Sequence, residues 1–236
     1  MWKLYDDLYI GIPSNIRIDR CVVGETWTVV RAGETVGIAR TMEPPEDPAD
    51  FAASFNGRFL RDVAGHLYWK TLAHASVGVA AMNAWYNTKE RILGLEGDCA
   101  PESLPGRTAY VGLATGADSF PLPMTPDVGA DTYGALKDYD NVVIAGEALI
   151  TRALPGLFDQ IGPDGHVVLE GKSLPASALF FSFGMPVREL RGHYCADPDA
   201  AETAAAENRE MPEAGFSPFC IRPLELARFQ AWRSAK

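Results

Sequence analysis

The sequence predicts a two-part α/β protein, in which an α+β unit is followed by a domain built on a parallel sheet. Near the N-terminus, β-like runs rich in Val, Ile and Thr lie close together and are followed by helical patterns. In the second half, short continuous apolar runs alternate with helix-compatible stretches. That alternation is typical of a parallel sheet covered by helices.

The first unit is predicted from its order of patterns. One helical segment, three β-like runs and two further helical segments follow one another at residues 2–10, 16–24, 25–32, 34–42, 58–69 and 71–87. The three β-like runs predict an antiparallel meander, because only short connections separate them. Small residues on the last helix would let it lie close to a sheet; they are Ala73, Ala75, Gly78, Ala80, Ala81 and Ala84. We expect an α+β domain over residues 1–95.

The second unit begins after a segment rich in Gly, Pro and acidic residues, which predicts a linker at 96–107. Four apolar runs beyond it, TAYVGLAT, NVVIAG, HVVLEG and MPVREL, are typical of strands buried on both faces. They predict a Rossmann-like α/β domain over 108–236. The Pro- and Gly-rich stretch at 116–140 shows no convincing helix or second strand, so we expect this domain to be shortened.

Composition excludes several function classes. The 236 residues carry a formal net charge of -10, which argues against nucleic acid and anionic membrane surfaces as partners. No apolar run approaches the roughly 20 residues needed to span a bilayer, and the N-terminal segment does not resemble a signal peptide. We therefore predict a cytoplasmic protein. The 4 cysteines are widely scattered, which excludes a zinc ribbon or a disulfide framework.

The first strand of the second unit ends in YVGLATGAD, which resembles a phosphate-binding turn. A dinucleotide-binding fingerprint requires a third glycine and a following helix, whereas this segment has only Gly112 and Gly116 and runs into prolines. A plain tight turn is the better interpretation, and no NAD or FAD cofactor is expected.

Glu147 directly follows the second predicted strand, at the start of a helix, with Thr151 one turn later. Ligands of open α/β sheets bind outside the carboxyl ends of the strands. A carboxylate there can coordinate a divalent cation or act as a general base. Equally, Glu147 can stabilise the positive end of the helix.

The arrangement recurs after the next strand, where Gly171, Lys172 and Ser173 precede Pro175. Lys172 and free backbone N–H groups would hold an anionic group. The alternative is that Ser173 caps a helix that has Pro175 in its first turn. If both turns carry function, they form one crevice.

Three polar residues of the first unit are candidates for ligand contact. Thr28 follows a large aromatic residue in a strand, and Asn83 and Asn87 lie on one face of the last helix. Asparagine is a poor helix former, so its presence asks for a reason. A helix end near Asn87 is the simpler explanation.

The segment GHYCADP places three ligand-type side chains, His193, Cys195 and Asp197, two residues apart. Asp197 is explained by capping of the helix that DPDAAETAAAENRE predicts. His193 and Cys195 alone are too few for a zinc site, which needs three or four ligands. We therefore predict a strand end beside the ligand site, with His193, Cys195 and Glu147 as the candidate metal ligands.

The order of these segments resembles the putative heavy-metal chelation family. The resemblance is carried by WKLYDDLYIGIP, GETWTVV, VGIARTM, GRFLRDVA and ASVGVAAMNAWYN, and later by NVVIAGEALITRALPGLF, VVLEGKSLPASALFFSFGM and ELRGHYCADP. It implies an enolase N-terminal-like domain joined to a Rossmann-like domain, with a ligand site between them. Family members usually carry a helix and a second strand after the Gly112 turn. Their absence from this pattern argues against a nucleotide site.

Two functions remain open on this basis. The first is binding or handling of a heavy metal or metal chelator in the cleft between the domains; the alternative is a small-molecule transferase or lyase that uses the same cleft. The ligand-binding candidates for both are Thr28, Asn83, Asn87, Glu147, Thr151, Gly171, Lys172 and Ser173. A module that only binds a protein partner is less favoured, because strand-end crevices bind small molecules.

Aromatic residues of the first unit predict association. They fall on elements that a small domain cannot bury entirely, which indicates a homodimer formed through this unit. These residues are Trp2, Tyr5, Tyr9, Trp69 and Trp85.

Overall fold

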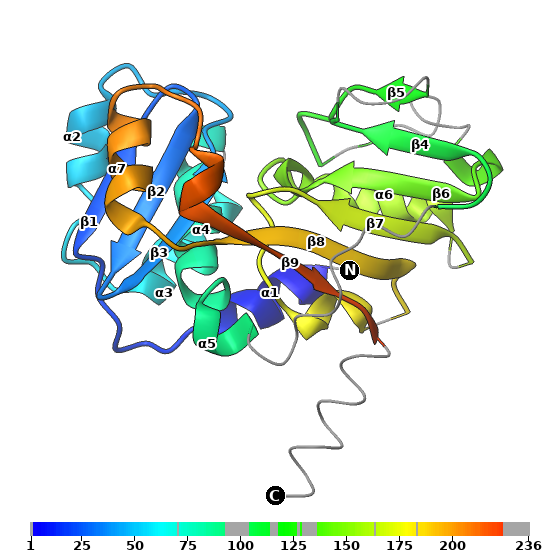
Figure 1. Ribbon diagram of the computed structural model, residues 1–236, viewed down its shortest axis with the longest axis horizontal. Helices are drawn as coiled ribbons and strands as arrows, with labels where there is room; N and C mark the ends of the chain where they lie inside the picture. Colours follow the sequence, from blue (N-terminus) through cyan, green and yellow to red (C-terminus); the bar gives the residue numbers. More distant parts are fainter. Residues whose placement is uncertain are drawn as a thin grey trace, which may run out of the picture.

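The computed structural model is a mixed α/β protein with two sheets lying side by side (Figure 1). It describes residues 2–69, 71–92, 104–113, 118–126, 128, 136–162, 164–182 and 184–223. Most of the predicted linker at 96–107 therefore lies outside the described residues. Within the described part of the chain, no helix is both long and apolar enough to cross a membrane.

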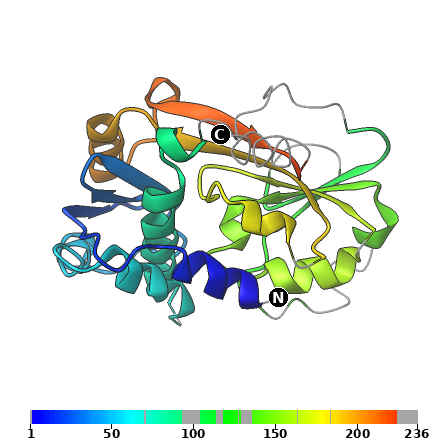
Figure 2. The same cartoon turned by 90° about the horizontal axis from the view of Figure 1, so that it is seen from below.

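The smaller sheet confirms the antiparallel meander. It has the order β1-β2-β3, formed by β1 (Arg20–Val23), β2 (Trp27–Ala32) and β3 (Thr35–Arg40). The remaining elements of this half are α1 (Trp2–Ile10), α2 (Pro48–Ala53), α3 (Leu60–Ala64), η1 (Gly65–Tyr68), α4 (Leu72–Tyr86) and α5 (Lys89–Ile92). The predicted helix at 58–69 is thus divided into a short α-helix and a 3-10 turn. Helix α1 contacts both α3 and η4 of the second half, and Figure 2 shows it lying between the two parts.

Helix α4 packs unusually close to β3, as its small residues predict. A side chain at Gly37 of β3 would overlap the backbone nitrogen of Ala84 and the backbone oxygen of Ala80. Only a residue without a Cβ fits where helix and strand backbones approach so closely. The contact brings the buried Asn83 side chain against the strand, where its Nδ2 donates to the Ile38 carbonyl at 2.7 Å.

The larger sheet has six strands in the order β5-β4-β6-β7-β8-β9. They are β5 (Ser119–Phe120), β4 (Thr108–Val111), β6 (Asn141–Ala145), β7 (His166–Glu170), β8 (Val187–Cys195) and β9 (Phe216–Ile221). Neighbouring strands are parallel except β8 and β9, which are antiparallel.

This sheet corrects two expectations. A second strand does follow the Gly112 turn, because two residues of β5 pair in parallel with β4; a strand this short leaves no apolar pattern to recognise. The sheet also has a strand beyond the four predicted apolar runs, since β9 follows β8 and pairs with its edge. Pro218 within β9 has no backbone N–H to donate, so the sequence of β9 has no clear strand pattern.

The strand order contains a topological switch. The chain passes from β4 to β5 on one side and then returns to β6 on the other side of β4. Such a reversal leaves a space outside the carboxyl ends of the two central strands, where open α/β sheets bind ligands. Those ends, at Val111 and Ala145, point toward the three-stranded sheet (Figure 1).

The helical elements of the second half are short. They are η2 (Leu136–Asp138), η3 (Gly146–Ala148), α6 (Leu154–Ile161), η4 (Ala178–Phe181), α7 (Pro198–Ala206) and η5 (Glu213–Gly215). Ser173 does not cap a helix, because the next helical turn begins only at Ala178 and is capped by Ser177. The capping explanation for Ser173 is therefore wrong.

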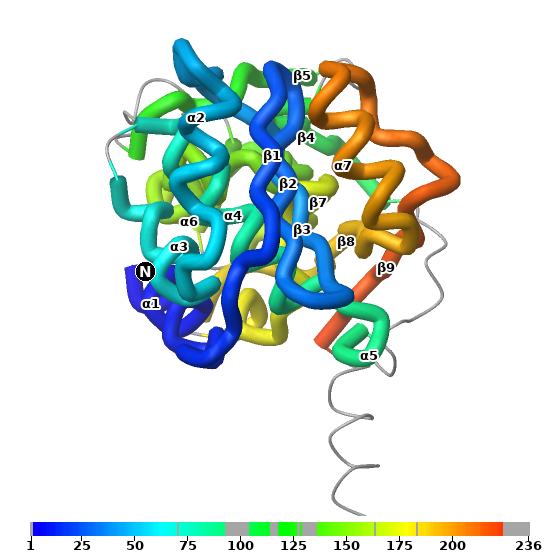
Figure 3. The backbone as a smooth tube through the Cα atoms, turned by 90° about the vertical axis from the view of Figure 1, so that its left-hand side faces the viewer, coloured from blue at the N-terminus to red at the C-terminus, as the bar shows by residue number. Residues whose placement is uncertain are grey.

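Helix α7 begins as predicted and then packs on the smaller sheet. Asp197 caps it by accepting a hydrogen bond from the Ala200 N–H at 3.0 Å. Its apolar face lies against the side of the three-stranded sheet opposite α4, as Figure 3 shows. The buried Glu202 pairs with Arg20 at 2.9 Å and with Arg31 at 3.4 Å. A segment from the second half of the chain thus completes the core of the first.

Candidate functional site

The two strand-end turns predicted to form one crevice do meet. Residues 146–148 follow β6 and residues 171–173 follow β7. The second segment contacts β3 through Ser173 and α4 through Lys172, and the first contacts the second through Glu147; we call this place the junction. The Ser173 hydroxyl donates to Glu147 Oε1 at 3.0 Å and accepts from the Arg40 backbone N–H at 3.0 Å. Glu147 is thereby held in place by a contact that also ties the two halves of the molecule together.

Gly171 leaves room for a small group beside the second carboxylate oxygen of Glu147. Its φ of 133° lies in a region that residues with a side chain rarely adopt. A Cβ at this position would lie 3.5 Å from the Gly146 nitrogen and 3.8 Å from Glu147 Oε2. The glycine therefore keeps a small space open beside a half-buried carboxylate.

Lys172 extends toward aromatic residues at the junction. Its Nζ lies 6.0 Å from the centre of the Trp27 ring and 5.9 Å from the centre of the Phe216 ring. The Arg40 guanidinium lies 5.1 Å from the same Trp27 ring. Cations at this range are attracted by the negative face of an aromatic ring. Lys172 and Arg40 thus bring two positive charges to the junction.

Asn83 and Asn87 reach the junction from α4 but differ in how fully their amide groups are hydrogen-bonded. Asn83 Nδ2 donates to Ile38 and also lies 3.4 Å from the Lys172 carbonyl, while its buried Oδ1 has no partner. Asn87 Nδ2 donates to the Leu174 and His193 carbonyls at 2.9 and 3.1 Å. Asn87 Oδ1 accepts from the Ala176 N–H at 2.7 Å. Both polar atoms of the Asn87 amide are therefore hydrogen-bonded to backbone groups of the second half of the chain.

Thr28 and Thr151 are fully buried. The Thr28 hydroxyl lies 2.9 Å from that of Thr41, so the two satisfy one another within the first half of the molecule. The Thr151 hydroxyl has no hydrogen-bond partner. Neither threonine contacts Glu147 through a described side-chain hydrogen bond, although the Thr151 backbone N–H donates to the Glu147 carbonyl at 3.1 Å.

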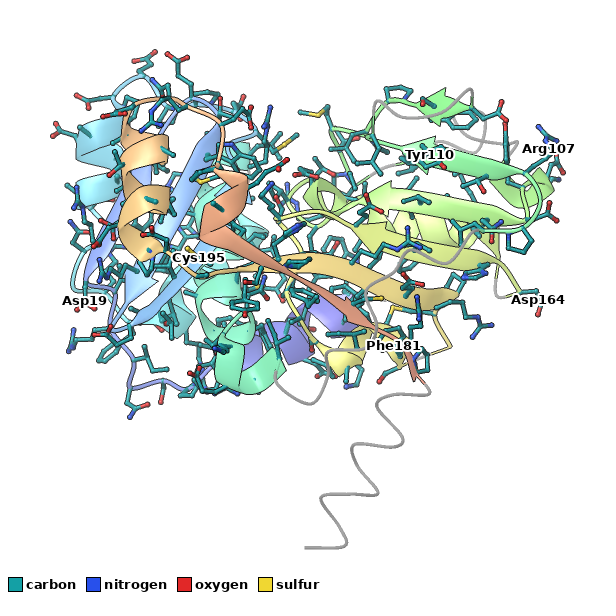
Figure 4. All side chains as sticks on the ribbon, in the orientation of Figure 1. Asp19, Arg107, Tyr110, Asp164, Phe181 and Cys195 are labelled. Carbon is teal, nitrogen blue, oxygen red and sulfur yellow. The ribbon has the colours of Figure 1, made fainter. Side chains whose placement is uncertain are left out.

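His193 and Cys195 lie on β8, where it leaves the parallel sheet toward the first half; Figure 4 labels Cys195 there. Burial and the nearby charge of Lys172 lower the pKa of His193, and its Nδ1 has no partner. Burial raises the pKa of Cys195 to about 12, so its thiol is protonated at neutral pH. Across the described residues, no group of three or more His, Cys, Asp or Glu side chains could hold a metal ion.

Of the predicted residues, the structure brings together Glu147, Gly171, Lys172, Ser173 and Asn83. Sequence reasoning missed Trp27, Arg40 and Phe216, which surround Lys172. Trp27 could have been found, because it is the large aromatic residue directly before Thr28, which was itself predicted to contact a ligand. Phe216 could not, since β9 was not recognised as a strand.

Two family models match the chain. One matches residues 5–86 and the other, named DUF364, matches residues 121–219; both are described as putative heavy-metal chelation. Together they cover most of the chain, including the strand-end turns of the junction. The chain belongs to the putative heavy-metal chelation family. Among curated proteins, none matches the chain significantly.

Solved structures of DUF364 proteins share this fold. One is a DUF364 protein of unknown function from Desulfitobacterium hafniense DCB-2, with a TM-score of 0.77, 23% identity, and coverage of 94% of this chain and 97% of the other. A second, from Pyrococcus horikoshii, has a TM-score of 0.70, 15% identity, and coverage of 93% and 98%. At these identities the likeness establishes the arrangement of both halves and nothing finer.

Because the family description refers to heavy metals, the junction was compared with known metal-ion sites. Glu147 offers one carboxylate, and the Ser173 hydroxyl offers one neutral oxygen that is already engaged. Catalytic zinc sites use about three protein ligands and structural sites four. The donor set described at the junction therefore does not fit a bare ion.

Proposed function

We propose that the protein binds a metal chelate, meaning a metal ion already held by a small organic chelator, at the junction between its two halves. Membership of the heavy-metal chelation family supports the ligand class. The topological switch between β4 and β6 supports the place of Glu147, which follows β6, because ligands of open α/β sheets bind at such a switch. The enolase-N-terminal-like and Rossmann-like assignments stay predictions and are not needed for this proposal.

The observation that carries the proposal is the anchored Glu147 carboxylate. Ser173 anchors one oxygen by donating a hydrogen bond to it, and Gly171 leaves room for a small group beside the other. A carboxylate held in this way gives a hard ligand for one open coordination position of a chelated metal. His193 and Cys195 stay candidate metal ligands, on the strand that passes beside Lys172.

The first test removes the negative charge of Glu147. We expect Glu147→Gln to weaken binding of a metal–nitrilotriacetate complex by about tenfold, the size expected when a ligand or its support is lost. Ser173→Ala should have a smaller effect in the same direction, because it leaves the carboxylate present but unanchored. Calorimetric titration of tag-free protein measures both affinities.

Glu46→Gln serves as the control, because Glu46 is exposed and lies on the loop after β3, away from the strand-end turns. Equal affinities for wild type and Glu147→Gln would overturn the role given to Glu147. If wild-type protein shows no metal–chelate binding at all, the proposed function is wrong.

The transferase or lyase alternative uses the same residues, with Glu147 as acid or base and Lys172 holding an anionic substrate. Within the described residues, no observation favours it over chelate binding. A cytoplasmic location also stays a prediction.

The homodimer stays a prediction that the exposed aromatic residues support. Tyr5 is fully buried within the chain, whereas Trp2 and Trp69 remain 47% and 50% exposed. An exposed tryptophan pair on neighbouring elements favours association. We expect light scattering at micromolar protein to give twice the chain mass of 25.6 kDa. Trp2→Glu should lower that value, and a single-chain mass for the unmodified protein would contradict the prediction.

A further inference from the structure

We infer that the chelator carries an anionic arm, a carboxylate or a phosphate, which binds between Lys172 and His193 beside the Trp27 and Phe216 rings. This inference rests on the proposed function and names the class of ligand for that site. It goes further because it assigns the recognition of the organic part of the ligand to residues other than Glu147.

The first observation is an uncompensated positive charge. Lys172 is half-buried, yet it forms no ion pair with any described residue. Its Nζ lies 6.0 Å from the centre of the Trp27 ring and 5.9 Å from the centre of the Phe216 ring. The protein has 31 acidic residues and 21 basic ones, so acidic partners are plentiful elsewhere. A partly desolvated ammonium that lacks a carboxylate is a ready binding point for an anion from solution.

The second observation is an unused nitrogen beside that charge. His193 Nδ1 is buried and has no hydrogen-bond partner. His193 lies close to this turn, because the Asn87 amide donates to the carbonyls of both Leu174 and His193. An imidazole nitrogen that carries hydrogen can donate to an anion. Lys172 and His193 therefore offer two donors.

Two other charged side chains, Arg40 and Glu210, lie near the Trp27 ring and pair with one another at 3.5 Å. Glu210 also accepts a hydrogen bond from Trp27 Nε1 at 3.2 Å. Trp27 and Phe216 are 6% and 7% exposed and form a fixed apolar wall. An anion that reaches Lys172 is thus shielded from water on one side, which strengthens its attraction to the ammonium.

The position of Lys172 connects the anionic arm to the metal. Gly171 and Ser173, its two neighbours in the chain, both lie beside the Glu147 carboxylate. Lys172 itself extends to the aromatic wall. Glu147 and Lys172 are therefore close enough for one small ligand to contact both. Its metal would bind the Glu147 carboxylate, and its anionic arm would bind the Lys172 ammonium.

The test uses the full chain in metal-free buffer and three probes: citrate, nitrilotriacetate and inorganic phosphate. We expect at least one probe to bind wild-type protein by calorimetric titration. Lys172→Met should weaken that binding by about tenfold or more, the effect of losing a hydrogen bond to a charged group. Lys172→Arg, which keeps the charge, should restore most of it, and His193→Phe should show a smaller loss.

The control is Lys89→Met, because Lys89 is an exposed lysine on α5. Thermal unfolding of each variant checks that the fold persists. Citrate or nitrilotriacetate as the tighter probe identifies a carboxylate arm, and phosphate as the tighter probe identifies a phosphate arm. Unchanged affinity in Lys172→Met, or no binding of any probe to wild type, overturns the inference.

The same measurements distinguish failure of the proposed function from failure of this inference. If wild type binds the metal–nitrilotriacetate complex in a manner that needs Glu147 but not Lys172, chelate binding stands and the anionic arm is wrong. If wild type binds neither the metal complex nor the free probes, both fall together. If the free probes bind through Lys172 but the metal complex does not bind, only the proposed function falls.

Discussion

Replacement of Gly37 by valine is expected to lower the free energy of unfolding by about 3 kcal/mol or more, at the upper end for overpacked cores. A side chain here would overlap backbone atoms of Ala80 and Ala84, which cannot move away as a flexible side chain can. The strand and helix α4 must therefore separate. Since Asn83 donates to the neighbouring Ile38 carbonyl, separation also disturbs the junction.

Chemical denaturation monitored by tryptophan fluorescence measures this loss. Gly33→Asn is a suitable control, because Gly33 has a φ of 62° in open space on the β2–β3 turn and Asn tolerates that conformation. We expect the control to change stability by less than about 1 kcal/mol. A Gly37→Val variant as stable as the control would show that α4 and β3 do not approach as closely as described.

Replacement of Asn87 by alanine is expected to cost about 3 kcal/mol, because three buried backbone groups would lose a partner. Its amide satisfies the carbonyls of Leu174 and His193 and the N–H of Ala176. These groups belong to the second half of the chain, whereas Asn87 ends helix α4 of the first. The loss should therefore appear as reduced stability of the whole molecule.

The Asn87→Asp variant distinguishes a structural role of Asn87, which is hydrogen bonding to the backbone, from a role in ligand binding. An aspartate keeps the size and the acceptor toward Ala176 but removes both N–H donors, so we expect it to destabilise nearly as much as alanine. Asn15→Ala, at an exposed position, is the control. If Asn87→Ala left the denaturation midpoint unchanged and reduced only ligand affinity, Asn87 would be a binding residue, as its helical face first indicated.

Local patterns explain which elements were predictable. The meander of β1–β3, helix α4 and the buried parallel strands each contain a periodic or continuous apolar pattern within one stretch of chain. Asp197 was predictable as a cap because capping depends on residues within a single turn. By contrast, β5 has two residues, and β9 contains Pro218, so neither leaves a clear signal.

The sequence by itself determined the fold class, the two strand-end turns and the presence of Glu147, Lys172 and Ser173 on them. Their meeting followed from the rule that parallel strands end at one edge of the sheet. Only the tertiary structure decided what surrounds them. Trp27 and Phe216 come from strands about 190 residues apart in the chain, and Asn87 turned out to hold backbone. Such contacts are set by how α4, α7 and the two sheets pack, and packing between distant segments leaves no periodicity in the sequence.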